Sequence, residues 1–302
     1  MWTPPFDAIG KYSSFENTIK IVGGRSLIWS RPTRFNDPFD CDPRFNLVRD
    51  GQAFKNELLN IADVLLSGNI DPDSLPDVQP SLGRLAASQA QTGRVNREFW
   101  IQHIIKLADE ILGSIGRANA IARRELLGPL QETKISCFTK AFYNIPMWSH
   151  YADNHRGALL LFAPRSPDSQ LSLPRPVRYS DELPVLYDEK ELAASVWASR
   201  LPDEDAMARR VFNDVVYWKT AEWSYEDEWR VHGGNGWHPA ESFELVRFNK
   251  EDLLAVIFGC KADLAQAKYL RSLAKPFLPH LQYYVCQQER DQAKIRFVPF
   301  LF

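Results

Sequence analysis

The stretch WSYEDEWRV, residues 223–231, places acidic side chains between aromatic ones. If this stretch is a strand, Glu226 and Glu228 point to the same face. Two carboxylates on one face repel each other, so burying both requires a nearby cation or hydrogen-bond donors. Arg230 continues that face and Lys219 lies just upstream. The pattern therefore predicts two carboxylates held close together by cations, which makes this stretch a candidate site for chemistry.

A plainer interpretation of the same stretch is an exposed edge strand whose charges face solvent and prevent aggregation. The aromatic residues Trp223, Tyr225 and Trp229 argue against it, because so many aromatic side chains are unusual around a fully solvated edge. The two glutamates are therefore the leading candidates for function.

A second acidic pattern, FNDPFD, occupies residues 35–40. Its proline predicts a turn that Asn36 and Asp37 cap, with Phe35 and Phe39 anchoring the loop in the core.

Two alternatives to a carboxylate-pair enzyme stay open. One is a metal-dependent nuclease or phosphoesterase, in which Lys219 lies near the phosphate and four carboxylates bind Mg²⁺: Asp37, Asp40, Glu226 and Glu228. The other is a non-catalytic binding or structural module, in which Arg230 or backbone donors satisfy the glutamates and no cleft lies beside them.

The stretch MWSHYADNHRG, residues 147–157, combines aromatic and imidazole side chains. Trp148 and Tyr151 are three apart and share a helical face, so they suit a core position or a pocket wall that stacks on a planar ligand. His150 and His155 are five apart, which does not place both on one face for a metal.

The elements that carry these motifs are typical of an α+β chain. Residues 8–30 read as strand, helix and strand, and residues 133–142 as a further strand. The tail alternates short strands with one helix. Residues 51–131 show helical spacing and are predicted to form a helical insertion within a single α+β domain, residues 1–302. Strands dispersed among helices without regular alternation predict a mixed sheet.

Composition is that of a soluble globular protein, with 45% hydrophobic and 25% charged residues among 302. The net charge of −2 gives no general reason to expect nucleic-acid or membrane binding. No apolar run of about 18 residues and no signal peptide occur, so a cytoplasmic protein is expected.

The four cysteines lie far apart, so no zinc or other metal site is predicted from them. Arg123 and Arg124 of the insertion suit a solvated face or, alternatively, a surface for a protein partner.

In combination and order, several of these motifs resemble a bacterial family catalogued as domain of unknown function 2971. They are KY at residues 11–12, LIWSRPTRFNDPFD, ISCFT, MWSHYADNHRG, and YEDEWRV followed by LLAVIFG. The resemblance spans nearly the whole chain except the helical insertion, and it implies no activity.

A more distant resemblance is to the ADP-ribosyltransferases, which have a split mixed β-sheet and three strand motifs. Residues 8–30 are similar to the first motif, with Lys11 or Tyr12 where those enzymes have His or Arg. ISCFT is similar to the second, with Ser136 in the matching place. EDE is similar to the third, the E-x-E pattern, with Glu228 matching the catalytic glutamate.

This second resemblance implies NAD as substrate and an ADP-ribosyltransferase or NAD glycohydrolase activity, as in toxins or defence effectors. Glu228 would stabilise the ribosyl cation, and Glu226 would activate an acceptor, either protein or nucleic acid. Tyr12 or Tyr151 would stack on nicotinamide, with Trp148 on the same helical face as Tyr151. Lys11 would bind the pyrophosphate.

Overall fold

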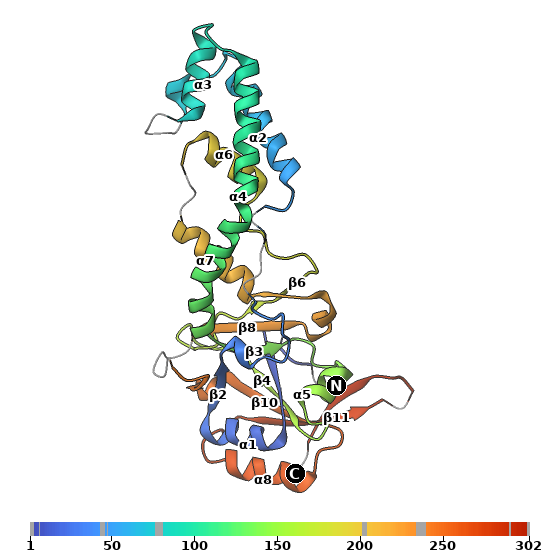
Figure 1. Cartoon of the computed structure of the whole chain (residues 1–302). Coiled ribbons are helices and arrows are strands. Elements are labelled where there is room, and N and C mark those ends of the chain that lie inside the picture. Colours follow the sequence, from blue (N-terminus) through green and yellow to red (C-terminus); the bar gives the residue numbers. More distant parts are fainter. Residues whose placement is uncertain are drawn as a thin grey trace. The chain divides into compact units, whose positions relative to one another are not determined.

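The computed structural model in Figure 1 describes residues 3–5, 7–42, 46, 48–75, 81–200, 204–233, 240–289 and 291–300. It confirms an α+β chain with a large mixed sheet. The chain divides into two compact units, described separately below. One comprises Met1–Cys41, Leu130–Asp181 and Tyr217–Phe302, and the other comprises Asp42–Pro129 and Glu182–Val216.

The first unit contains the sheet, with neighbouring strands in the order β12-β11-β10-β4-β1-β3-β2-β9, and with β8 paired to both β3 and β5. Its strands are β1 (Ile9–Ser13), β2 (Ser26–Ser30), β3 (Lys134–Thr139), β4 (Ala158–Phe162), β5 (Arg175–Pro176), β8 (Glu228–Gly233), β9 (Phe243–Arg247), β10 (Leu253–Phe258), β11 (Gln282–Gln288) and β12 (Ile295–Pro299). Beside them, β6 (Arg178–Tyr179) and β7 (Trp218–Lys219) form a short parallel pair.

Strand β3 is where the sheet splits. On one edge it pairs with β8 along its whole length, from Lys134 to Thr139. On the other edge it pairs with β1 only through Thr139 and with β2 only through Ile135. Strands β1 and β2 therefore part from each other along one edge of β3, which leaves room for a cleft between them.

Local signals explain the β1–α1–β2 segment, where the predicted strand, helix and strand are confirmed. Helix α1 (Phe15–Gly24) begins at Ser14, whose hydroxyl oxygen accepts from the backbone N–H of Asn17. It ends at Arg25, which adopts a left-handed conformation with φ of 49°. The helix thus begins and ends where a capping residue and a conformational stop are present.

Helices cover both faces of the sheet. Helix α1 and α8 (Leu264–Ala274) lie together on one face in Figure 1, and their buried Val22 and Leu270 share a core with Leu27 of β2. Helix α5 (Ile145–Tyr151) packs on the other face through Met147 and Trp148. This packing fixes α5 beside β1.

Gly157 is required at the start of β4. A Cβ atom there would lie 2.1 Å from the carbonyl oxygen of Ser13, a distance that no real side chain tolerates. The glycine therefore allows the chain leaving α5 to approach the end of β1 closely.

The second unit is helical. It contains α2 (Gly51–Leu65), α3 (Leu82–Gln91), α6 (Glu189–Trp197), α7 (Glu204–Val216) and most of α4 (Arg97–Glu132). The buried face of α2 includes Phe54 and Leu58, and the indole N–H of Trp197 in α6 donates to the carbonyl of Leu58.

The helical unit bears on three sequence predictions. The unit includes most of the predicted insertion, residues 51–131, and it also includes residues 182–216. That the whole chain forms a single domain stays a prediction. The Arg123 side chain lies outside the described part of the chain, while Arg124 is exposed. Within the part described, no helix is both long enough and apolar enough to cross a membrane.

Candidate functional site

The stretch of residues 221–231 is not one strand, so the predicted alternation of Glu226 and Glu228 is wrong. Ala221–Glu226 forms a 3-10 turn, Asp227 is left-handed with φ of 42°, and β8 begins only at Glu228. The end of β3 holds this turn: the Thr139 hydroxyl donates to the Glu226 carbonyl, and the Lys140 N–H donates to the Asp227 carbonyl over 3.0 Å. The two glutamates nevertheless converge, one from the turn and one from the strand.

Lys219 lies at the centre of this convergence. Its ammonium group is 2.7 Å from Glu226 Oε2, 3.4 Å from Glu228 Oε2 and 3.8 Å from Asp40 Oδ2. All four side chains are buried, and β8 lies between β3 and β5. The interpretation of this stretch as an exposed edge strand is therefore wrong.

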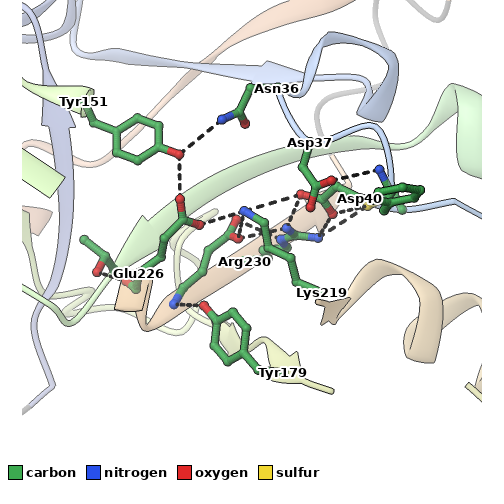
Figure 2. Close-up of polar contacts among 12 residues, drawn as sticks. Asn36, Asp37, Asp40, Tyr151, Tyr179, Lys219, Glu226 and Arg230 are labelled. Atoms are coloured by element: carbon green, nitrogen blue, oxygen red, sulfur yellow. Dashed lines mark hydrogen bonds and ion pairs between the residues drawn. The ribbon is translucent and has the colours of Figure 1, made fainter. Parts of the chain in front are cut away.

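Arg230 is fully buried and bridges two carboxylates, as Figure 2 shows. Its Nε and Nη2 atoms donate to the two oxygens of Glu228, each over 2.8 Å. Its Nη1 and Nη2 atoms donate to the two oxygens of Asp40 over 2.8 and 2.7 Å. Both contacts are bidentate, the geometry in which an arginine–carboxylate pair is strongest. We call Asp40, Lys219, Glu226, Glu228 and Arg230 the charge cluster.

Aromatic hydroxyl groups complete the hydrogen bonding of the glutamates. The Tyr151 hydroxyl donates to Glu226 Oε1 over 2.5 Å and accepts from the Asn36 amide over 3.4 Å. The backbone N–H of Glu228 donates to the Tyr179 hydroxyl over 2.7 Å. Burial and the contact with Glu226 raise the pKa of Tyr151, so its phenol stays protonated and a donor.

The charge cluster holds three carboxylates against two cations. Burial by itself would raise the pKa of Glu228, but Arg230 and Lys219 outweigh it and lower that pKa to about 2. The neighbouring carboxylates in turn raise the pKa of Lys219 above its usual value, against the effect of burial. Both groups are therefore charged at neutral pH, and the site keeps a fixed negative carboxylate in a buried setting.

This carboxylate reaches a cleft of about 540 Å³ in the split of the sheet. Residues of β1, β2, β3 and α5, together with residues 34–36, form its walls, and Asp40, Lys219, Glu226 and Glu228 line it too. The interpretation as a structural module predicts satisfied glutamates and no cleft. Hydrogen bonds and ion pairs do satisfy both glutamates, but a cleft lies beside them.

The cleft brings together Lys11, Tyr12, Tyr151, Glu226 and Glu228 among the residues singled out in the sequence. The Lys11 ammonium donates to the Cys137 carbonyl over 2.8 Å, and burial lowers its pKa. The Tyr12 hydroxyl donates to the carbonyls of residues 141 and 142, so it also anchors the segment before α5.

Two other predicted site residues do not line the cleft. Ser136 is buried and its hydroxyl has no hydrogen-bond partner, whereas Ile135, Cys137, Phe138 and Thr139 of the same strand line the cleft. Trp148 is fully buried in the core, and its indole N–H donates to the Phe142 carbonyl. Its role is to hold α5 rather than to form the cleft wall.

The FNDPFD loop behaves partly as predicted. Asp37 caps the turn by accepting from the Phe39 N–H over 2.9 Å. Phe39, however, is 47% exposed, so its predicted place in the core is wrong. Asp40 instead joins the charge cluster through Arg230, a partner 190 residues away that no local signal identifies.

The four carboxylates proposed as magnesium ligands do not form a cation site. Lys219 and Arg230 already occupy the space between Asp40, Glu226 and Glu228. Among the residues described above, no group of three or more His, Cys, Asp or Glu side chains has a geometry that suits a metal. The carboxylates of the charge cluster are thus paired with side-chain cations.

The low pKa of Glu228 predicts acid sensitivity. A glutamate whose folded-state pKa is depressed stabilises the fold above its unfolded pKa, and this stability is lost as the pH falls toward the folded value. We expect the free energy of unfolding, measured by urea titration, to decline as the pH falls from about 4.5 to about 2. The Glu228→Gln variant should decline less steeply in this window; an identical slope would contradict the assigned pKa.

Comparison with known proteins supports one of the two resemblances in part. Residues 147–231 match the model of a family described as "Protein of unknown function (DUF2971)". The match covers less than a third of the chain and includes residues 147–151 of α5 together with Lys219, Glu226, Glu228 and Arg230. No curated protein and no solved structure gave a significant match.

Proposed function

We propose that the chain binds NAD in the cleft and cleaves its nicotinamide–ribose bond, as an ADP-ribosyltransferase or NAD glycohydrolase. One observation carries this proposal: two buried carboxylates, paired with Lys219 and Arg230, reach the wall of a cleft large enough for part of a dinucleotide.

The chemistry requires a fixed negative charge. When the bond between nicotinamide nitrogen and ribose C1′ breaks, both bonding electrons leave with neutral nicotinamide, and the ribose becomes an oxocarbenium-like cation. A preorganised carboxylate stabilises that charge best when it is ionised before the reaction and needs no reorganisation. Glu228 meets this condition, since Arg230 both lowers its pKa and holds its orientation.

Glu228 keeps acceptor capacity toward a substrate. A carboxylate offers about four lone-pair positions; the Arg230 fork uses one on each oxygen, and Lys219 donates to Oε2 over 3.4 Å. A ribose hydroxyl would take the remaining position, in competition with the Cys137 thiol that also interacts with this carboxylate. Glu226 is placed to accept the proton of the attacking water or acceptor group.

Cations at the cleft wall suit the pyrophosphate. The sequence singled out Lys11 for this role. Arg34 also lines the cleft and is exposed, and a guanidinium can bind a phosphate through two parallel N–H donors. Sequence reasoning missed Arg34, although it stands within LIWSRPTRFNDPFD.

The test is calorimetric titration of NAD⁺ into the protein, with nicotinamide release followed in parallel. We expect saturable binding and slow release. Ile28→Trp narrows the cleft at a 42%-exposed position away from the charge cluster, and it should weaken binding about tenfold. Binding of neither NAD⁺ nor ADP-ribose would reject the proposal and leave a structural role for the charge cluster.

A further inference from the structure

Strand β9 ends the sheet on one side. It pairs with β2 from Ser26↔Arg247 to Ser30↔Phe243, and no strand in the ranges that the structure covers pairs with its outer edge. Exposed edges of this kind are templates for pairing with another chain. Proteins usually protect them with proline, lysine or a bulge, and FELVR contains neither of those residues.

The hydrogen bonds flanking β9 show which of its backbone groups face outward. The Arg31 N–H donates to the Ser242 carbonyl over 2.9 Å, and the Phe248 N–H donates to the Arg25 carbonyl over 3.1 Å. In an antiparallel pair, hydrogen-bonded residue pairs alternate with non-bonded ones. The odd-numbered residues of β9 therefore direct their N–H and C=O groups away from β2.

The side chains of these residues form an apolar patch with charged ends. Leu245 is 59% exposed and Phe243 is 39% exposed, and Leu245 lies opposite Ile28, itself 42% exposed. Glu241 precedes the strand and Arg247 ends it, and both are exposed. Opposite charges thus stand on either side of two apolar residues.

We propose that the chain forms a homodimer by antiparallel pairing of β9 with β9 of a second copy. In the register centred on Glu244, Phe243 lies opposite Leu245 of the second copy, and Glu241 lies opposite its Arg247. Because the pairing is two-fold symmetric, each contact occurs twice. Backbone pairing, apolar contact and charge complementarity are satisfied together.

Only some registers of the β9–β9 pair are possible, because only the odd-numbered residues direct their backbone groups outward. In each possible register, an odd-numbered residue lies opposite an odd-numbered residue of the second copy. The neighbouring register, centred on Leu245, would place Phe243 opposite Arg247 and Glu241 opposite Asn249. That register would lose the Glu241–Arg247 ion pair and would replace two Phe243–Leu245 contacts with one Leu245–Leu245 contact. The register centred on Glu244 is therefore the more complementary one, and its self-complementarity makes a second copy the occupant.

The test is sedimentation velocity on the full chain over a dilution series, with Glu241→Arg, Arg247→Glu and the double variant. The wild type should be dimeric. Each single variant places like charges opposite each other twice and should raise the dissociation constant about tenfold. The double variant restores opposite charges and should recover the wild-type value.

A matched control is Lys268→Glu, an exposed charge reversal on α8 that should leave the dissociation constant unchanged. Three results would overturn the proposal: a wild type that stays monomeric at the highest concentration, single variants that dimerise normally, or a double variant that does not recover. None of these measurements involves NAD, so the outcome is independent of the proposed activity.

Discussion

Replacing Arg230 by methionine is expected to lower the free energy of unfolding by about 3–5 kcal/mol. The guanidinium is fully buried and donates to all four carboxylate oxygens of Asp40 and Glu228. Without it, these two charges stay buried with only Lys219 nearby, at 3.4 Å and 3.8 Å. Urea denaturation monitored by tryptophan fluorescence measures the loss.

Two further variants show whether the loss of stability comes from the bidentate contacts of Arg230 or from the removal of any arginine. Arg230→Lys keeps the charge but not the bidentate fork, so it should fall between wild type and Arg230→Met. Arg296→Met removes an exposed arginine from β12 and should change stability by no more than about 0.5 kcal/mol. If Arg230→Met costs less than Arg230→Lys, the fork does not hold the charge cluster together.

The charge cluster is hard to explain by stability alone. Replacing a buried ion pair with well-packed apolar residues is often neutral or stabilising, because desolvation offsets most of the attraction. Here four of the five charged side chains lie at the wall of a cleft, and three of these four are carboxylates. Such an arrangement keeps the ionised Glu228 carboxylate beside a cleft, which is what the proposed activity requires.

The sequence predicted those parts of the fold that depend on neighbouring residues. The strand, helix and strand of residues 8–30 follow from the local sequence, in which a serine precedes the helix as its cap. The pairing of Glu228 with Arg230 and of Glu226 with Lys219 follows from the need to neutralise buried carboxylates within one stretch.

The errors arose where distant or conformational information was needed. The left-handed conformation of Asp227, which interrupts the predicted strand, leaves no clear mark in the sequence, because non-glycine residues adopt it only rarely. Whether Ser136 or its neighbours line the cleft depends on how the strand is placed in the sheet, and a shift of one residue changes the answer. The contact of Asp40 with Arg230 joins residues far apart in the chain.

Glu228→Gln is expected to lower nicotinamide release about 10²–10³-fold while leaving NAD binding and the fold in place, if the proposed activity holds. The substitution removes the charge that would stabilise the oxocarbenium-like state. It also changes the charge cluster from three carboxylates and two cations to two of each, so no cation is left without a carboxylate partner. Release is measured under saturating NAD⁺, with circular dichroism and urea denaturation on the same preparation.

Glu226→Gln is the matched control, since it removes one negative charge from the same buried cluster. Glu226 is assigned to accept a proton from the attacking group and not to stabilise the ribosyl cation. Release of nicotinamide should therefore fall much less in this variant, while transfer to an added acceptor should fall more. Equal losses of release in both variants would show that the charge cluster acts only by supporting the fold. A normal rate in Glu228→Gln would remove Glu228 from the chemistry.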